Sequence, residues 1–436
     1  MSQARPARPP LRDTFRALRN PNYRLFWAGQ LASLTGTWMQ RIAQAWLVLR
    51  LTDSPLALGT VTAIQFTPIL LFSLAGGALA DRFPKRRVLL VTQAVMLLQA
   101  ATLAALTTAG LIQLWHIYCL ATMLGLASAI DNPTRQSFVV EMVGTNDLQN
   151  AVALNSAQFN TARILGPALG GVVIATAGVA GCFALNAASY LAVIGSLLLM
   201  RAERLLTPAP AKKGRLLSQI GEGLRYAATT PDVALVVLLL AVIGTFGYNF
   251  TLILPLIAQY VLGEGPVGFG LLASAMGAGS LGAALGLAIA GRPTRRTLLA
   301  GAAGFSLLLA SVGLSRWLPL TLLLLVGLGL CSIVFQATAN TRLQLVTPPP
   351  LRGRVMGLYA LLFAGTTPIG SLAVGTAAER FGVQAAVAGA AALCAAGVVA
   401  GLLYARRAAG RLLPDPPPAV EPADGPAALE PRKASP

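Results

Sequence analysis

The sequence predicts an all-α membrane protein whose twelve transmembrane helices form two pseudo-symmetric halves of six. Hydrophobic residues make up 55% of the 436 residues and charged residues only 11%, which is more apolar than a soluble globular domain tolerates. The apolar residues also form long unbroken runs. A run of roughly 20 apolar residues crosses the ~30 Å hydrocarbon core of a bilayer, and a single run does so as a helix because its backbone groups then bond internally. The lipid bilayer is therefore the first expected partner.

Twelve apolar runs have the length of a membrane span. They lie near residues 25–49, 56–80, 88–109, 114–139, 151–177, 179–200, 233–262, 267–291, 297–315, 317–340, 355–378 and 383–404. These runs predict six-helix bundles at 23–200 and 233–405, separated by a polar cytoplasmic linker at 201–232. We expect a cytoplasmic N-terminal segment at 1–22 and a Pro-rich, disordered cytoplasmic tail at 406–436.

The positive charges occupy alternate loops. The net charge is +18, and 26 of the 33 Lys and Arg lie before the first run, in the linker, in the tail and in three short loops. The other loops carry only Arg50, Arg316 and Arg380. This asymmetry is typical of the positive-inside rule, so we expect a multi-pass protein of a bacterial inner membrane with both termini cytoplasmic. The cations form no stripe with interleaved aromatic residues, so nucleic acid is not an expected partner.

Residues typical of catalysis, metal binding or cofactor binding are not evident. The cysteines Cys119, Cys182, Cys331 and Cys394 lie inside apolar runs without paired spacing, which indicates packing rather than a disulfide or metal site. No Gly-rich phosphate loop ending in Lys occurs, so we do not expect ATP to drive the protein. No cluster of carboxylates, His and nucleophiles lies at membrane depth, so we expect neither an enzyme nor a cofactor or metal.

A charged loop follows the second apolar run. The stretch Gly76-Gly77-Ala78-Leu79-Ala80-Asp81-Arg82-Phe83-Pro84-Lys85-Arg86-Arg87 resembles the signature between helices two and three of the major facilitator superfamily. In that superfamily this loop gates alternating access. The resemblance implies a gating loop of Gly77, Asp81, Arg82, Lys85 and Arg86 together with Glu141.

In that gate, Asp81 is expected to cap the start of the eleventh span near Val355, where the helix dipole favours a carboxylate. Arg82, Lys85 and Arg86 are expected to reach acidic partners such as Glu141. The alternative interpretation is a basic loop that only fixes the topology of the chain, although such a loop does not need an aspartate.

The fifth span carries a second motif. Arg163-Ile164-Leu165-Gly166-Pro167-Ala168-Leu169-Gly170-Gly171 resembles the Gly-Pro-rich motif of superfamily antiporters. Proline removes a backbone hydrogen bond, and small residues at four-residue spacing allow close helix contact. The resemblance implies that Gly166, Pro167, Gly170 and Gly171 meet the eighth span between the halves, where Ser274, Ala278, Gly282, Gly286 and Ala290 form a matching face. General membrane packing is the alternative.

Charged residues within lipid are costly and therefore often functional. Asp131 is the one acidic residue placed well inside a predicted span, and it suits either proton coupling or a permanent ion pair with Arg135, one helical turn away. Arg163, near the middle of the fifth span, is a third coupling candidate. It either tethers Asp131 or attracts an anionic substrate.

Polar residues near the predicted midplane are candidates for a substrate cavity. They are Gln40, Arg41, Gln65, Tyr248, Asn249 and Gln336. Together with neighbouring aromatic residues they suit an amphipathic organic molecule. Packing between helices is the alternative for each.

The resemblance extends over about residues 15–405. Tyr23–Gln30, Trp38–Arg41 and Ala151–Ser156 are similar to the bacterial branch that includes the enterobactin exporter and multidrug-type exporters. The resemblance implies a monomeric secondary active transporter that exports a drug-like compound or siderophore by alternating access in exchange for protons. The alternatives are a metabolite importer or facilitator, and a membrane receptor of the same fold that does not transport.

Overall fold

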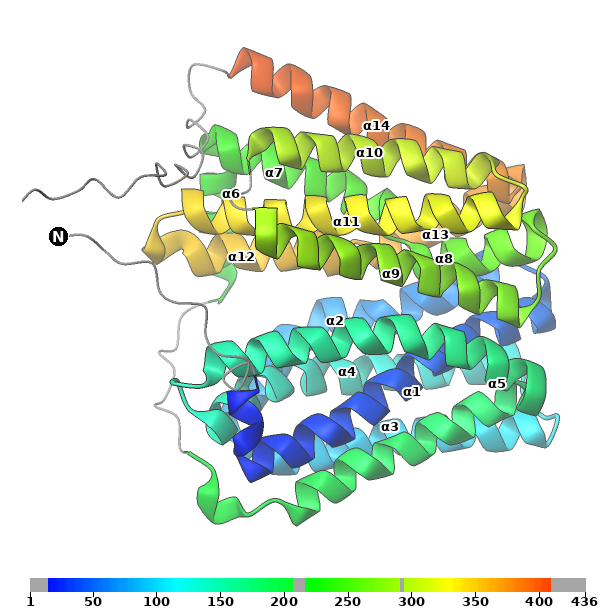
Figure 1. The fold of residues 1–436 in the computed structure, drawn as a ribbon, viewed down its shortest axis with the longest axis vertical. Coiled ribbons are helices and arrows are strands. Elements are labelled where there is room, and N and C mark those ends of the chain that lie inside the picture. Colours follow the sequence, from blue (N-terminus) through cyan, green and yellow to red (C-terminus); the bar gives the residue numbers. More distant parts are fainter. Residues whose placement is uncertain (1–14, 207–215, 291–293, 409–436) are drawn as a thin grey trace, which may run out of the picture.

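The computed structural model describes residues 15–206, 216–290 and 294–408, and every regular element in these ranges is helical (Figure 1). The expected N-terminal segment up to residue 14 and the expected disordered tail beyond residue 408 lie outside the described residues. The elements are η2 (Arg16–Arg19), α1 (Pro21–Thr52), α2 (Pro55–Arg82), α3 (Lys85–Thr108), α4 (Leu114–Val143), α5 (Leu148–Leu199), η3 (Ala202–Arg204), α6 (Leu216–Thr229), α7 (Pro231–Val242), η4 (Ile243–Gly247), α8 (Phe250–Leu256), η5 (Ile257–Val261), α9 (Pro266–Ala290), α10 (Arg295–Leu314), α11 (Leu318–Val346), α12 (Pro349–Ala364), α13 (Thr367–Phe381) and α14 (Val383–Arg407).

Side-chain caps fix several helix starts. The Asn20 side chain accepts hydrogen bonds from the backbone N–H groups of Asn22 and Tyr23 at the start of α1. Ser54 does the same for Ala57 in α2, with Pro55 at the first helical position. These residues satisfy N–H groups that have no partner within the helix, so the helices begin where the sequence supplies a cap.

Ten described stretches are long and apolar enough to cross a membrane. Helix α1 is not among them although it has 32 residues, because polar residues such as Gln30 and Gln40 lower its hydropathy. Helix α5 counts once, although Gly178 interrupts it with a φ of 74°, which lies in the left-handed region that favours glycine. The side chains of Val91 and Leu307 are 63% and 69% exposed, which suits a surface that faces lipid.

The helices lie in two groups, one below the other in Figure 1. We call α1–α5 the first group and α6–α14 the second group. The end of the molecule where α1 begins and α2 ends is called the basic end, because most of the described Lys and Arg outside the helix interiors lie there. The end where α1 ends and α2 begins is called the opposite end.

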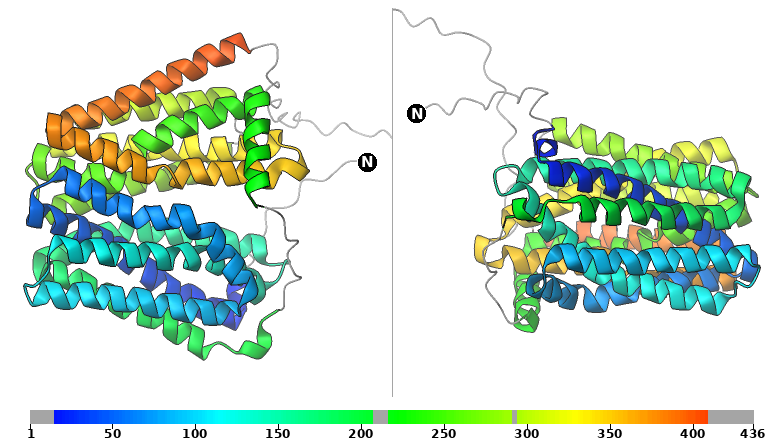
Figure 2. Two further views of the ribbon diagram at one scale, coloured as in Figure 1. Left: turned by 180° about the vertical axis from the view of Figure 1, so that it is seen from behind. Right: turned by 90° about the horizontal axis from the view of Figure 1, so that it is seen from below.

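The two groups contact each other mainly through two helix pairs. Helix α5 packs on α9, and α2 packs on α13. Close approaches to the second group run along α2 from Pro55 to Leu70, and along α5 from Gly171 to Arg163. Both stretches belong to the half of the molecule nearer the opposite end. Toward the basic end the groups diverge, as Figure 1 and the view from behind in Figure 2 show.

Two predicted spans are interrupted in the structure. The span expected at 233–262 consists of α7 and α8 with the π-helical turns η4 and η5, and the span expected at 355–378 breaks at Gly365 and Thr366 between α12 and α13. Runs that are apolar throughout do not reveal such breaks from their composition. π-Helical turns within helices are frequent at functional sites.

The segment expected as a polar linker contains a helix. Helix α6 lies across the ends of its neighbours at the basic end rather than alongside them (Figure 2). Its Tyr226 hydroxyl donates to the Val346 carbonyl over 3.4 Å, and Ala227 is buried. On the other side of the linker, the Leu206 N–H donates to the Glu141 carbonyl over 2.8 Å. The linker is therefore anchored to both groups.

Candidate functional site

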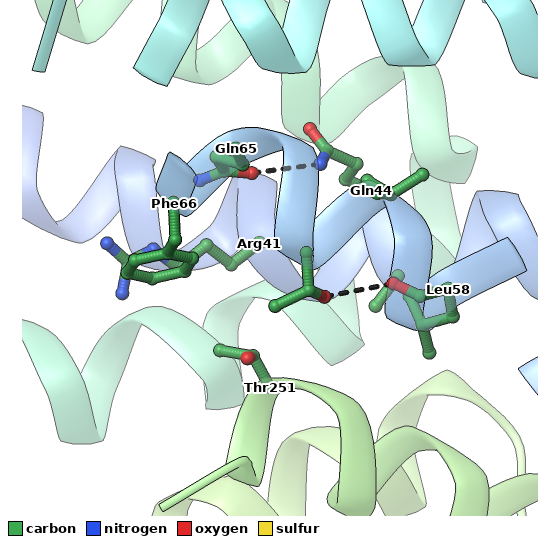
Figure 3. A pocket seen from close by; sticks show the side chains of 9 residues that line it. Arg41, Gln44, Leu58, Gln65, Phe66 and Thr251 are labelled. Carbon is green, nitrogen blue, oxygen red and sulfur yellow. Dashed lines mark hydrogen bonds between the residues drawn. The ribbon is translucent and has the colours of Figure 1, made fainter. Parts of the chain in front are cut away.

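A small cavity lies at the seam between the two groups. Arg41 and Gln44 of α1 and Gln65 of α2 line it from the first group, and Thr251 of α8 faces them from the second (Figure 3). Its volume of about 30 Å³ is the space of one water molecule, whereas sites for drug-sized ligands hold ~300–1,000 Å³. The cavity itself is therefore much smaller than a drug-sized molecule in this conformation.

Arg41 brings a positive charge to this cavity. Its guanidinium lies over the Trp38 ring, 4.5 Å from the ring centroid, in a cation–π arrangement. The Gln44 side chain donates to Gln65 Oε1 over 3.2 Å, so these two amides bind each other. The Nε of Arg41 is buried and has no hydrogen-bond partner among the described residues. The structure therefore brings the predicted residues Arg41 and Gln65 together and adds Gln44.

Arg163 lies on the stretch of α5 that approaches the second group. It donates to Asn160 Oδ1 over 3.1 Å, and its Nε is buried without a partner in the described part of the chain. It lies near Tyr248, which lies between η4 and α8. The suggested tether between Arg163 and Asp131 does not form, since Asp131 pairs with Arg135 instead.

The remaining predicted cavity residues of the second group bind within that group. The Tyr248 hydroxyl donates to the Ser332 carbonyl over 3.0 Å, and its ring packs against three phenylalanines. Asn249 is 1% exposed and donates to the Thr245 carbonyl over 2.6 Å. Gln336 lies beside the Tyr359 hydroxyl. Tyr248 and Asn249 are therefore held by bonds within the second group, and the Oδ1 of Asn249 is buried without a partner among the described residues.

Gln40 does not face the cavity. It is 2% exposed, donates to Gln99 Oε1 over 3.0 Å and accepts from Asn186 Nδ2 over 2.7 Å. These partners lie on α3 and α5, so Gln40 joins three helices of the first group. Neighbouring residues of a helix point about 100° apart, which explains why Arg41 reaches the seam and Gln40 does not.

Asp131 is fully buried in a polar cluster. One carboxylate oxygen pairs with Arg135, and the other accepts from the Thr92 hydroxyl over 2.8 Å and from the Gln93 amide over 2.9 Å. Arg135 also donates to Gln30 Oε1 over 3.1 Å. The carboxylate therefore has a compensating charge and partners on both oxygens, which favours the ion-pair interpretation.

A second buried ion pair lies in the second group, where the sequence placed Asp232 only at the end of a span. Arg342 donates to Asp232 over 2.9 Å, and the two side chains are 6% and 3% exposed. The sequence shows Arg342 next to a long apolar run, but it does not show that Asp232 is its partner. The pair joins α7 to α11.

The gating loop is a short turn between α2 and α3 at the basic end. Lys85 pairs with Glu141 of α4 over 2.6 Å, and both side chains are largely buried. Arg86 pairs with no carboxylate among the described side chains; it donates to the carbonyls of Leu197 and Leu198 over 2.7 and 3.1 Å. Those carbonyls lie at the C-terminus of α5, where the helix dipole favours a cation.

The other residues of the loop are placed differently. The Arg82 side chain is exposed, with its guanidinium 6.0 Å from the Phe83 ring centroid, and among the described residues the ion pair of Glu141 is formed by Lys85. A Cβ added at Gly77 meets only Pro133 of α4, at an ordinary 3.9 Å. The expected cap by Asp81 falls on a side chain outside the described residues.

Two carboxylates cross between the groups at the opposite end. Asp53 of the first group accepts from the Tyr260 hydroxyl over 2.7 Å. Glu379 of the second group accepts from the Ser54 hydroxyl over 2.9 Å and from the Leu56 N–H over 3.1 Å, at the N-terminus of α2. The sequence analysis did not predict either contact. For Glu379 a signal was present, because the helix start at Ser54 and Pro55 leaves N–H groups free that attract a carboxylate.

The interface motif of α5 divides between two neighbours. A Cβ added at Gly166 falls 2.4 Å from the Trp38 Cβ, and one at Gly170 falls 3.3 Å from the Met39 Cα, so these glycines face α1 within the first group. A Cβ added at Gly171 falls 2.8 Å from the Pro266 carbonyl oxygen of α9. The motif therefore permits close contact both within the first group and across the seam.

The face of α9 that meets α5 differs from the expected one. The Ser274 hydroxyl donates to the Ile164 carbonyl over 2.9 Å, and Cβ atoms added at Gly270 or Gly277 fall 2.6 and 2.8 Å from α5 atoms. A Cβ added at Gly282 or Gly286 meets nothing within 4 Å. Helices that diverge toward the basic end lose contact there, which is why only the first half of α9 is used.

The chain is similar in sequence to a known protein family and to several characterised transporters. Residues 12–414 match the family described as transmembrane secretion effector. The chain is 27% identical to the multidrug efflux pump Tap of Mycolicibacterium fortuitum, over 81% of this chain and 88% of the relative. It is 26% identical to the staphyloferrin A transporter of Staphylococcus aureus, over 82% and 90% of the two chains. It is 25% identical to the enterobactin exporter EntS of Shigella boydii, over 82% and 85%.

Among solved structures, a bacterial homologue of the lysosomal transporter Spinster, inward-facing and occupied, matches with a TM-score of 0.70 at 12% identity, over 91% of this chain and 99% of that chain. This likeness shows the fold. The family match over residues 12–414 shows that the chain belongs to the transmembrane secretion effector family of the major facilitator superfamily, a family of membrane transporters.

Proposed function

We propose that this protein is a secondary active transporter that exports an amphipathic small molecule from the bacterial cytoplasm by alternating access. The observation that carries the proposal is the seam between the two groups. The groups contact each other at the opposite end, and the buried polar groups of Arg41 and Arg163 lie next to those contacts. Relatives named as a multidrug efflux pump and as an enterobactin exporter support the direction of transport.

The proposed topology has twelve spans in two halves of six, with both termini cytoplasmic. Two additions to the ten apolar stretches give this count: α1, which is long enough at 32 residues, and a division of α5 at Gly178. The basic end is then the cytoplasmic side under the positive-inside rule. The conformation with contacts at the opposite end is accordingly inward-facing.

We further propose protons as the counter-ion. A proton cycle through Asp131 requires Arg135 to leave the carboxylate in another conformation, because the pair is closed in this one. The Arg135 side chain is 24% exposed, whereas the Asp131 side chain is fully buried. Exchange for protons predicts that collapse of the proton gradient stops export.

The test is efflux from cells that lack their own pumps, with a panel of dyes, antibiotics and catecholate siderophores, in the presence and absence of a protonophore. The proposal expects lower accumulation of at least one compound and recovery of accumulation when the protonophore is added. Asp81→Asn tests the gating loop in the same assay. Equilibration that ignores the protonophore contradicts coupling, and an unchanged level of every compound contradicts export.

A further inference from the structure

We propose that the substrate is an organic anion whose carboxylate, or comparable acidic group, binds between Arg41 and Arg163. This inference rests on the proposed function, because it names the chemical class of molecule that the transporter carries. It concerns binding, so it can be tested apart from transport.

The helices α1, α4, α5 and α11 carry Arg41, Arg135, Arg163 and Arg342, and the structure divides these arginines into two kinds. Arg135 and Arg342 each pair with a buried aspartate. Arg41 and Arg163 form no ion pair with any carboxylate of the described residues; their electrostatic neighbours are tyrosines. A cation removed from water without a compensating charge is unfavourable, so the positions that retain one are candidates for binding an external anion.

Both uncompensated arginines approach the same turn of the second group. Arg41 lines the seam cavity together with Thr251. Arg163 lies near Tyr248, three residues before Thr251, where the π-helical turn η4 leads into α8. Two helices of the first group therefore bring their charges to one short stretch of the second.

Trp38 links the two arginines on the side of the first group. Its ring lies under the Arg41 guanidinium and makes an edge contact with Phe159, with ring centroids 5.9 Å apart. Its Cβ lies against Gly166. Phe159 and Gly166 are one helical turn before and after Arg163, so Trp38 packs on the part of α5 that carries this arginine.

The free donors of this site suit an anion with an aromatic or apolar body. A guanidinium presents its N–H groups as a planar fork that matches a carboxylate, and the buried Nε of each arginine is unused. Trp38 and the aromatic cluster around Tyr248 supply ring surface. Two positive charges without counter-ions repel a cationic ligand, so the same residues select against cationic drugs.

The test is equilibrium binding to the purified full chain in detergent, measured by isothermal titration calorimetry. The probes are matched pairs that differ in charge: 2-naphthoate and 2-naphthylmethylamine, and carboxyfluorescein and rhodamine 123. The variants are Arg41→Gln and Arg163→Gln, and the conservative variants Arg41→Lys and Arg163→Lys are measured in parallel. Arg50→Gln is the matched control, since Arg50 lies on the same helix α1 but is exposed at the opposite end.

We expect an anionic probe to bind at least about tenfold more tightly than its cationic partner, and each glutamine variant to lose about tenfold or more of that affinity. The lysine variants should retain the charge preference and lose part of the affinity, whereas Arg50→Gln should bind as the parent does. Equal affinity for both charges, or glutamine variants that bind anions as the parent does, overturns the inference.

Flux in proteoliposomes with the same probes separates this inference from the proposed function. Anion-selective binding that depends on both arginines, without flux, supports the site and contradicts export. Flux of the cationic probes without any preference for anions supports transport and overturns the anion site.

Discussion

The two ends of the molecule use their carboxylates differently. At the basic end, Glu141 pairs with Lys85 and Asp131 with Arg135, and each pair joins residues of a single group. At the opposite end, Asp53 and Glu379 accept hydrogen bonds from residues of the other group. Charges at one end therefore hold each group together, and charges at the other end hold the two groups to each other.

This difference suggests which contacts change during a transport cycle. Contacts within a group keep it rigid, so they should persist in every conformation. Contacts across the seam at the opposite end must break if that end opens. The hydrogen bonds there are few and exposed, which suits a contact that forms and breaks, whereas the pairs within the groups are more buried and therefore more costly to disrupt.

The largest expected effect comes from the buried pair of the second group. Asp232→Asn removes the buried carboxylate that pairs with Arg342, which should lower the free energy of unfolding by about 3–5 kcal/mol. The midpoint of thermal unfolding in detergent measures this loss. Glu203→Gln is the control, because Glu203 is exposed. An unchanged midpoint would show that this pair does not stabilise its group.

The next effect concerns the close contact between α5 and α9. Gly171→Ala places a Cβ 2.8 Å from the Pro266 carbonyl oxygen, so it should disfavour closure of the opposite end by ~1–3 kcal/mol. The measurement is the distance distribution between spin labels at Leu51 and Phe381, which are exposed on different groups. Gly282→Ala, which meets nothing within 4 Å, should leave the distribution unchanged.

A smaller effect is expected at the gating loop. Glu141→Gln removes the partner of the largely buried Lys85 and should destabilise the first group by ~1–2 kcal/mol. The same spin-label distances should not change, because the pair lies within one group. The exchange Lys85→Glu with Glu141→Lys should recover part of the unfolding midpoint. A change in the distances without a change in the midpoint would contradict the comparison between the ends.

The smallest effect is expected from the exposed contacts at the opposite end. Glu379→Gln weakens the bonds to Ser54 and Leu56 and should cost ~0.5–1 kcal/mol, which shifts the ratio of open to closed forms by about two- to fivefold. The unfolding midpoint should remain within error. A distance distribution equal to that of the parent would show that Glu379 does not hold the groups together.

The sequence predicted the helical class and the superfamily because both depend on features that do not require tertiary structure. Long apolar runs and alternating loop charges follow from the bilayer alone. The turn at Gly178 was also placed correctly between two expected runs, at 151–177 and 179–200, since the combined run was too long for one span.

The residues of the site were predicted less well because a uniformly apolar helix does not reveal which side faces which neighbour. Gln40 and Arg41 are adjacent, yet one binds within the first group and the other reaches the seam. Asp53 and Glu379 were missed because each is a loop-side carboxylate in the sequence. Only the packing of the two groups shows that they bridge them, Glu379 through α2 and Asp53 through Tyr260 of η5.

The anchored linker sets a limit on how far the protein can open. Leu206 is bound to the first group and α6 to the second, and nine residues, 207–215, connect them. A fully extended chain rises ~3.3–3.6 Å per residue, so the backbones of Leu206 and Leu216 can separate by at most about 33–36 Å. The linker therefore sets a maximum separation of the two groups at the basic end. Shortening the linker residue by residue should reduce that maximum separation in measurable steps.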